Sequence, residues 1–107
     1  MKSGKDYKFG DIFLAHVQFI DSGEIKTRPA LVLFEEYGNI VIVGITSNPH
    51  TKGISITKEE GMEVDSVIKL NYIMTISEKQ VKKYLFTVSN NKKQEVKQAL
   101  LGKYTLN

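Results

Sequence analysis

The sequence predicts an α+β domain in which a small, strongly curved antiparallel sheet or open barrel comes first and helices pack at one end. Three observations predict it. The chain has 107 residues, which suffices for one modest core but not for two. Short apolar or alternating segments, separated by turn residues, fill most of the chain up to residue 76. Helical spacing of apolar residues comes only later, so no helix separates the first strands as a parallel sheet would require.

Five segments are predicted to be the main strands. Asp11–Phe19 alternates in part between apolar and polar residues. Pro29–Phe34 and Ile40–Ile45 are apolar runs joined by a short turn, which predicts an antiparallel pair at the centre of the sheet. Ile54–Ile56 and Ser66–Ile76 alternate again and complete the set.

Two charged or polar segments lie outside these strands. Residues 1–9 are predicted to form a loose leader, and Lys58–Asp65 a charged loop. Ser77, with Gln80 at the third following position, matches a capping box and predicts a short helix as far as Lys83.

The C-terminal part is predicted to contain a small strand, Leu85–Val88, and then a last helix from Asn90 to about Lys103. The apolar residues of this helix fall at helical spacing: Val96, Ala99, Leu100 and Tyr104. We expect residues 1–107 to form a single domain.

Composition narrows the function classes. The net charge of +3 permits a polyanionic partner without requiring one. Residues 77–107 carry seven lysines against two glutamates, which indicates either a solvated helical surface or a surface facing phosphates. The absence of cysteine excludes disulfides, thiolate zinc sites and thiol catalysis, and two histidines are too few for a histidine-only metal site. No cofactor is expected. With no apolar run near the length of a membrane span, we expect a cytoplasmic protein.

Arg28 and Thr46 are the strongest candidates for chemistry. Arg28 is the only arginine, and Pro29 after it favours an extended backbone. Its guanidinium suits bidentate phosphate binding, although a surface salt bridge is the simpler interpretation. Thr46 and Ser47 end a buried strand, where their hydroxyls either donate to a phosphate or cap the strand end.

Four further residues are weaker candidates. Asp21 is either a general base or an ordinary turn residue, and His16 is either catalytic or a structural residue of its strand. Lys69 and Asn71 share one face of the long strand, where Lys69 faces either a phosphate or solvent. The residues alone therefore predict a candidate anion site but no enzyme class.

Several segments together resemble the PemK/MazF family of toxins from toxin–antitoxin systems. The resemblance covers roughly residues 9–104 and rests on segments in a fixed order: Gly10-Asp11-Ile12, Arg28-Pro29-Ala30-Leu31-Val32-Leu33, Ile45-Thr46-Ser47 and Met74-Thr75-Ile76-Ser77. It implies an SH3-like barrel with a C-terminal helix, assembled as a homodimer with an RNA-binding groove across the interface.

The resemblance also implies an activity. Members cut single-stranded RNA at short motifs without a metal, by attack of the 2′-hydroxyl on the adjacent phosphorus, and a cognate antitoxin blocks the groove with an acidic tail. Arg28 matches the arginine that stabilises the transition state, Thr46 matches the threonine that binds the phosphate, and Ser47 assists. Phe19, Tyr37 and Tyr72 are candidate platforms for stacked bases.

Some positions depart from the family pattern. Met74 stands where many members have arginine, and Lys69 and Asn71 stand where some have arginine and aspartate. These departures keep two alternatives open: a non-catalytic PemK-like protein, and a gyrase-binding protein of the related CcdB type. An SH3-like peptide-binding module is a third, but the chain lacks the aromatic residues expected of such a groove.

Overall fold

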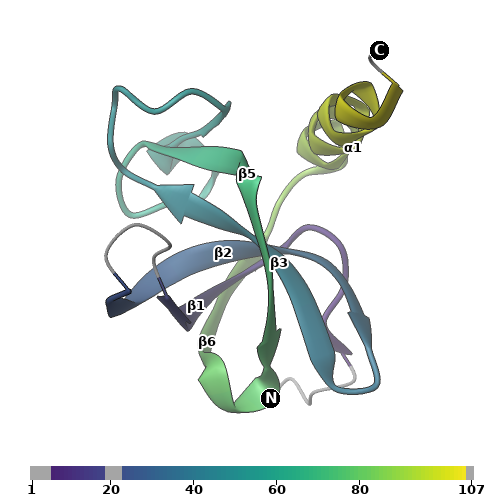
Figure 1. Cartoon of the computed structure of the whole chain (residues 1–107). Helices are drawn as coiled ribbons and strands as arrows, with labels where there is room; N and C mark the ends of the chain where they lie inside the picture. The colour runs from purple at the N-terminus through teal and green to yellow at the C-terminus, as the bar shows by residue number, and fades with distance from the viewer. Residues whose placement is uncertain (1–5, 19–22, 106–107) are drawn as a thin grey trace.

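The computed structural model describes residues 6–18 and 23–105. Six strands form one antiparallel sheet in the order β4-β5-β3-β2-β1-β6, which curls into an open half-barrel (Figure 1). The elements are β1 (Asp11–Gln18), β2 (Ile25–Glu36), β3 (Asn39–Thr46), β4 (Ile54–Ile56), η2 (Lys58–Glu60), β5 (Ser66–Ser77), η3 (Glu78–Gln80), β6 (Val81–Thr87) and α1 (Asn90–Thr105). The predicted α+β class, with a curved antiparallel sheet and a C-terminal helix, is confirmed.

The central pair is β2 and β3, as the two apolar runs predicted. Tyr37 and Gly38 form the turn between them, and both have positive φ angles, 53° and 82°. Two such residues give a tight hairpin whose twist matches that of the strands. At the far end of the hairpin Ala30 pairs with Gly44. Because the strands are antiparallel, this register directs the preceding part of β2 toward the end of β3.

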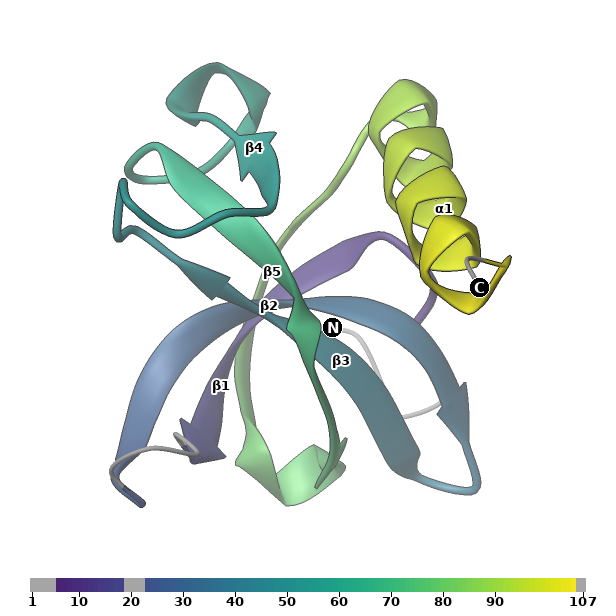
Figure 2. The same ribbon diagram turned by 45° about the horizontal axis from the view of Figure 1, so that its top comes forward.

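Strand β5 bends sharply where it passes Gly44. Along β3 the register advances from Val43 to Ile45, while along β5 it moves from Ile73 to Ile68. The extra residues form a bulge, and a bulge bends its strand. Beyond the bend β5 pairs with β4, so one strand joins two parts of the half-barrel (Figure 2).

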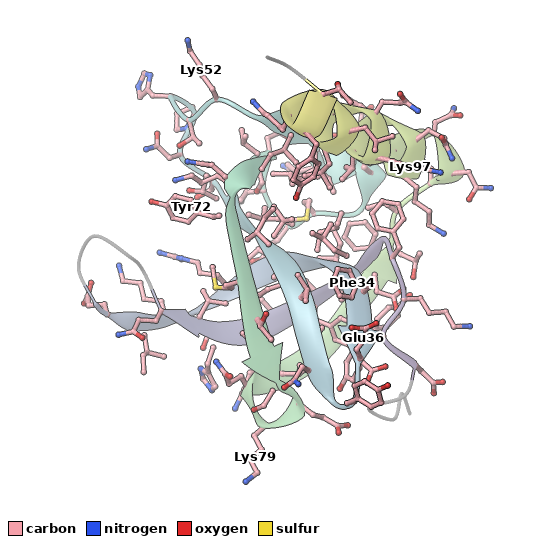
Figure 3. All side chains as sticks on the ribbon, turned by 45° about the vertical axis from the view of Figure 1, so that its right-hand side comes forward. Phe34, Glu36, Lys52, Tyr72, Lys79 and Lys97 are labelled. Atoms are coloured by element: carbon pink, nitrogen blue, oxygen red, sulfur yellow. The ribbon has the colours of Figure 1, made fainter. Side chains whose placement is uncertain are left out.

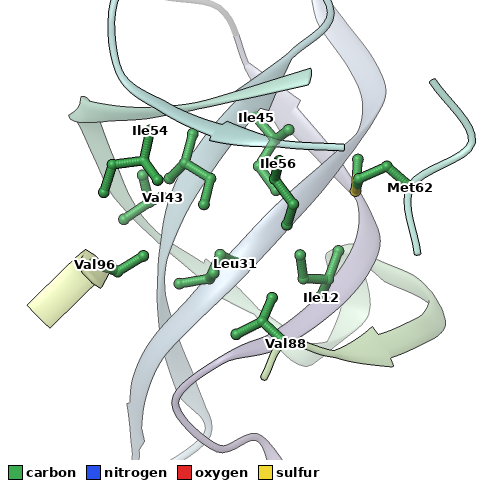
Figure 4. Close-up of a cluster of buried hydrophobic side chains, with 10 residues drawn as sticks. Ile12, Leu31, Val43, Ile45, Ile54, Ile56, Met62, Val88 and Val96 are labelled. Carbon is green, nitrogen blue, oxygen red and sulfur yellow. The ribbon is translucent and has the colours of Figure 1, made fainter. Parts of the chain in front are cut away.

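Both faces of the central strands are buried. One hydrophobic cluster lies between α1 and the face of the sheet that includes β4. Figure 4 shows Met62 at the edge of this cluster. The second cluster lies on the opposite face, because neighbouring strand residues point to opposite sides. Its members are Tyr7, Phe13, Ala15, Val17, Ala30, Val32, Ile40, Ile42 and Ile76. Apolar runs in β2 and β3 thus reflect burial on two sides.

The helix predicted from Ser77 to Lys83 is wrong. Only the single turn η3 forms, and the chain then extends as β6, which begins at Val81, before the predicted strand Leu85–Val88, and ends at Thr87. The physical reason is pairing: β6 covers the edge of β1, which would otherwise present unpaired backbone groups. The Asp11 carboxylate accepts a hydrogen bond of 2.6 Å from the Thr87 hydroxyl and ties the two strands together.

Smaller differences between the predicted and observed elements occur at three other places in the chain. In the expected leader Tyr7 is buried against Phe13, with ring centres 5.0 Å apart, so the chain packs onto the sheet before β1 begins. The expected loop at Lys58–Asp65 begins with the helical turn η2. The final helix α1 ends at Thr105 and buries Val96. Within residues 6–18 and 23–105, no helix is long and apolar enough to cross a membrane.

Candidate functional site

A small hollow of about 190 Å³ lies at the open end of the β2–β3 hairpin. Arg28 from β2, Thr46 from β3 and Lys69 from β5 all line it. The register of the β2–β3 hairpin places Arg28 near Thr46, and the bulge in β5 brings Lys69 close to both. Its other lining residues are Val17, Gly44, Ile45, Asn48, Thr51, Tyr72 and Met74. Two cations and several hydroxyl or amide groups around one hollow suit an anion.

The loop after β3 fixes the Thr46 hydroxyl. The backbone amide of Asn48 donates to Thr46 Oγ1 at 3.2 Å, and Asn48 Oδ1 accepts from the amide of His50 at 3.0 Å. The amide of Thr51 donates to the Asn48 carbonyl at 3.1 Å. Side-chain bonds of this kind stabilise tight turns at asparagine. Because Thr46 Oγ1 accepts from Asn48, its own hydrogen is left for a ligand in the hollow.

Lys69 is held against Tyr72. The Lys69 ammonium lies 3.4 Å from the centre of the Tyr72 ring, a cation–π contact. Tyr72 in turn packs beside Gly44, where an added Cβ would lie 3.4 Å from Tyr72 Cβ. Figure 3 shows Tyr72 and Lys52 on the same side of the molecule, away from Lys79. This arrangement fixes the position of a second positive charge near Arg28.

A larger hollow of about 480 Å³ adjoins the first. Arg28 and Ile45 line both, so Arg28 stands between them. The larger hollow is bounded by β1, β2, the end of β3, the segment between η2 and the start of β5, and β6. Its remaining lining residues are Leu14, Thr27, Pro29, Ser47, Gly61, Met62, Glu63, Val64, Ser66, Lys83 and Leu85.

The structure brings some of the candidate residues together and separates others. Arg28, Thr46 and Lys69 share the small hollow, and Ser47 lines the larger one. Asn71 instead lines a different surface hollow with Lys52 and Lys103, together with Lys69.

His16 lies away from the small hollow. Ala15 pairs with Arg28 and His16 with Thr27, so His16 and Arg28 lie on opposite faces of the β1–β2 pair. The Nδ1 atom of His16 is 3.1 Å from Thr27 Oγ1. The role of His16 in the chemistry stays a prediction that this placement does not favour.

The aromatic candidates differ in position. Tyr72 lines the small hollow. Tyr37 is 99% exposed at the turn of the hairpin, at the opposite end of β2 and β3 from Arg28 and Thr46. Phe19 and Asp21 lie outside the described residues.

Two charged lining residues have no functional signal in the sequence. The sequence predicts Glu63 only as part of a charged loop, and Lys83 as the end of a helix. Lys83 instead lies on β6 opposite Leu14 of β1. Apolar and charged residues alternate too weakly in Val81–Tyr84 to reveal this first half of the strand, so the sequence holds no clear signal for Lys83.

The larger hollow has a wall anchored by Lys92 of α1. The Lys92 ammonium donates to the Ser55 carbonyl at 2.7 Å and forms ion pairs with Glu60 at 3.2 Å and Glu95 at 3.0 Å. These contacts join β4, η2 and α1. The segment after η2, which carries Met62, Glu63 and Val64, begins at this anchor.

Comparisons with known proteins find solved structures with a similar fold. The solved structure of the toxin MazF-mt6 from Mycobacterium tuberculosis is similar at a TM-score of 0.73, with 18% identity over 91% of this chain and 98% of that one. A MazE–MazF structure from Deinococcus radiodurans has a TM-score of 0.69, with 15% identity over 99% and 100% of the two chains.

A mycobacterial endoribonuclease in complex with its cognate antitoxin is also similar, with a TM-score of 0.66 and 15% identity over 92% and 95% of the two chains. At such identities these likenesses establish the fold. A family model described as the PemK-like, MazF-like toxin of type II toxin–antitoxin systems matches residues 8–102. With almost the whole chain matched, this protein belongs to the PemK/MazF-like family of type II toxin–antitoxin toxins.

Proposed function

We propose that this protein is a toxin endoribonuclease that cuts single-stranded RNA, with Arg28 and Thr46 as its catalytic residues. The observation that carries the proposal is the small hollow, where Arg28, Thr46 and Lys69 surround a space suited to one phosphate group. A polyanionic strand also suits the positive net charge. The family supports the reaction class.

The proposed reaction is an internal transfer at phosphorus. The 2′-oxygen of one nucleotide forms a bond to the adjacent phosphorus, and the bond from phosphorus to the 5′-oxygen of the next nucleotide breaks. The products are a 2′,3′-cyclic phosphate and a 5′-hydroxyl. A base accepts the 2′-hydroxyl proton, and an acid returns a proton to the departing 5′-oxygen.

The side chains in the hollow suit the charge that develops during this transfer. The phosphorane carries extra negative charge on its non-bridging oxygens, which preorganised cations and hydrogen-bond donors stabilise. Arg28 supplies a planar fork of donors, Lys69 a second cation, and Thr46 an oriented hydroxyl. With two cations supplied by side chains, the step is proposed to need no metal, and retained cutting in EDTA is the test.

We propose Asp21 or His16 as the base that accepts the 2′-hydroxyl proton, with Asp21 as the first to test. His16 is the other candidate, but it lies on the opposite face of the β1–β2 pair from Arg28. Asp21 belongs to the segment that joins these two strands. If Asp21 is the base, Asp21→Asn loses cutting and His16→Gln keeps it; the reverse pattern would transfer the role to His16.

The proposed partners follow from the family. One is an antitoxin with an acidic segment, since solved relatives include MazE–MazF and an endoribonuclease with its cognate antitoxin. Such a complex should weaken as the salt concentration is raised.

The other proposed partner is a second copy of this chain, for which an apolar surface beside α1 is available, including Phe34, Leu101 and Tyr104. A monomeric mass by light scattering would oppose the homodimer. We propose the cytoplasm, where mRNA is found, as the site of action.

One observation favours a non-catalytic alternative. Met74 lines the small hollow at the position where many relatives have arginine, so an apolar group replaces a cation there. A protein with this hollow could bind RNA or a protein partner such as gyrase without cutting RNA.

The experiment that tests the proposal compares three proteins on a long single-stranded RNA in EDTA: wild type, Arg28→Ala and Lys26→Ala. Lys26 is a matched control, since it lies on the same strand, pairs with Glu24 at 3.6 Å and does not line either hollow. We expect discrete cuts with cyclic-phosphate and 5′-hydroxyl ends from wild type and Lys26→Ala, and none from Arg28→Ala. Intact RNA with folded wild type, free of antitoxin, would favour the binding alternative.

A further inference from the structure

The larger hollow has the composition of a nucleotide-base pocket rather than that of a second phosphate site. Its volume of about 480 Å³ falls within the range of roughly 300–1,000 Å³ usual for small-molecule pockets. Met62, Val64, Leu85 and Pro29 give it apolar walls, and Val64 is 49% exposed at the surface. A flat aromatic base with polar edges matches apolar walls that carry a few polar groups.

Two charged side chains line this hollow besides Arg28. Glu63 comes from the segment after η2, and Lys83 comes from β6. In the described part of the chain, neither side chain has a hydrogen bond or an ion pair. Arg28 at one boundary also lines the small hollow, where we place the phosphate that is cut.

We propose that the larger hollow binds the base next to the cut phosphate, that Glu63 selects a base with amino donors, and that Lys83 binds the phosphate on the far side of that nucleotide. A carboxylate accepts hydrogen bonds but donates none. Guanine offers two neighbouring donors on its pairing edge, and cytosine and adenine offer an amino group. Uracil presents carbonyl oxygens on both sides of its single donor, and these repel a carboxylate.

The proposal makes Glu63 a specificity-determining residue and Lys83 a phosphate-binding residue. It rests on the proposed function, because it takes the ligand to be the RNA strand whose phosphate lies beside Arg28. Neither role requires that the protein cuts RNA, so binding measurements test both roles independently.

The methionines provide site-specific probes. Met62 lines the larger hollow, Met74 lines the small one, and the third methionine, Met1, lies outside the described residues. In protein labelled with ¹³C at the methionine methyl groups, NMR therefore reports the two hollows separately. The ligands are 2′-O-methyl trinucleotides, U-G-U and U-U-U, which lack the attacking hydroxyl and cannot be cut.

We expect U-G-U to shift both the Met62 and Met74 signals, and U-U-U to shift chiefly Met74. The affinity for U-G-U should exceed that for U-U-U by about fivefold or more, since a good bidentate contact to a base discriminates at this level. Glu63→Gln should remove the preference. The control Glu59→Gln, an exposed residue of η2 that does not line the hollow, should keep it.

Lys83→Met should weaken both trinucleotides alike and lower the slope of log affinity against log salt by about 1. Lys82→Met is its matched control, because Lys82 is the adjacent residue of β6 and, unlike Lys83, does not line the larger hollow. Unchanged salt dependence in Lys83→Met would overturn the phosphate-binding role.

Three outcomes overturn the proposed base pocket. The first is that U-G-U shifts the Met74 signal but not the Met62 signal, and the second is that both trinucleotides shift the Met62 signal equally. The third is that Glu63→Gln still binds U-G-U more tightly than U-U-U. A uniform loss of cutting in Glu63→Gln without a change in base preference would also overturn it, in favour of a catalytic carboxylate. If wild type responds at Met62 yet cuts no RNA, the pocket stands and the endoribonuclease proposal fails. If wild type cuts RNA but U-G-U does not shift the Met62 signal, the endoribonuclease proposal stands and the base pocket fails.

Discussion

The Lys69 ammonium lies 3.4 Å from the centre of the Tyr72 ring, and both side chains line the same hollow as Arg28. The contact depends on the bulge in β5, which places Lys69 and Tyr72 opposite Gly44 of β3. A lysine side chain has many rotamers, and the ring restricts where its charge lies. Tyr72 therefore has a positioning role in the proposed site.

The first prediction concerns this pair. Lys69→Met should lower kcat/KM for RNA cutting about tenfold or more, because it removes a cation near the developing charge. Tyr72→Phe keeps the ring and should retain most activity, whereas Tyr72→Leu should lose much of it. The measurement is the initial cutting rate on a short RNA. Lys79→Met on η3, which Figure 3 shows at the bottom of the molecule and away from Tyr72, serves as control, and equal losses in Lys79→Met and Lys69→Met would refute a local role.

The second prediction concerns Thr46. Thr46→Val keeps the shape of the side chain but removes the hydroxyl that Asn48 orients, so cutting should fall about a hundredfold. Thr46→Ser keeps the hydroxyl and should retain activity within about tenfold. Both variants should unfold near the wild-type midpoint in urea, since Thr46 is only half-buried. If Thr46→Val cuts RNA like wild type, the hydroxyl has no part in the reaction.

The sequence predicted the centre of the sheet well because the strands there are buried and therefore consist largely of apolar residues. Apolar runs in β2 and β3 and alternation in β5 indicate strands without knowledge of their partners. The first residues of β2 could not be found in this way. Lys26, Thr27 and Arg28 are polar, and they extend β2 because they pair with Val17, His16 and Ala15 of β1.

The dependence of strands on distant pairing partners also explains why the predicted helix at Ser77–Lys83 is wrong and why Lys83 was missed. The capping pattern at Ser77 is satisfied, since its amide donates to Gln80 Oε1 at 3.0 Å, but one turn is enough to satisfy it. Whether the chain continues as helix depends on long-range pairing with β1, which no local pattern records. Lys83 was hidden by this error, because its place in the larger hollow exists only when residues 81–87 form a strand.

The third prediction concerns the anchor formed by Lys92, whose side chain is 12% exposed. Lys92→Met should lower the free energy of unfolding by about 1–3 kcal/mol, because it removes charge-assisted hydrogen bonds to Ser55, Glu60 and Glu95. Lys97→Met, an exposed change on the same helix, should have little effect. Urea unfolding near pH 7 measures the difference, and equal stability of the two variants would contradict the anchor.

The pH dependence of this difference follows from two pKa shifts. Burial opposes ionisation of Glu60, but hydrogen bonds from the Thr57 backbone amide and Lys92 outweigh it and lower the pKa of Glu60. Burial also opposes the charge on Lys92, but hydrogen bonds to Glu95 and Glu60 outweigh it and raise the pKa of Lys92.

The signs of these shifts define a pH window. Stabilisation by Glu60 is present above its unfolded pKa of 4.5 and is lost as pH falls through the lower folded value. Stabilisation by Lys92 is present below 10.5 and is lost as pH rises through its raised folded value. The stability difference between wild type and Lys92→Met should thus be greatest between these limits and shrink at both extremes. A difference that is constant from acid to alkaline pH would contradict the assignment.

The last prediction concerns Gly53, at the end of the loop that carries Asn48 and Thr51. A Cβ added there would overlap the Ile68 carbonyl oxygen and lie 2.7 Å from Val67 Cγ1. The Ile68 backbone cannot yield easily, because it pairs with both β3 and β4. Gly53→Ala should therefore lower the free energy of unfolding by about 1–3 kcal/mol, the usual cost of overpacking. It should also reduce RNA cutting, because the displaced loop holds the Thr46 hydroxyl in place.

Gly102→Ala is the matched comparison for this substitution. Gly102 lies in α1, and a Cβ added there meets no atom within 4 Å. The same change should therefore raise the free energy of unfolding by about 0.5–1 kcal/mol, since alanine favours a helix over glycine. Urea unfolding of both variants, together with their cutting rates, separates a local clash from a general effect of the added methyl group. A Gly53→Ala variant as stable and active as Gly102→Ala would contradict the close approach of this loop to β5.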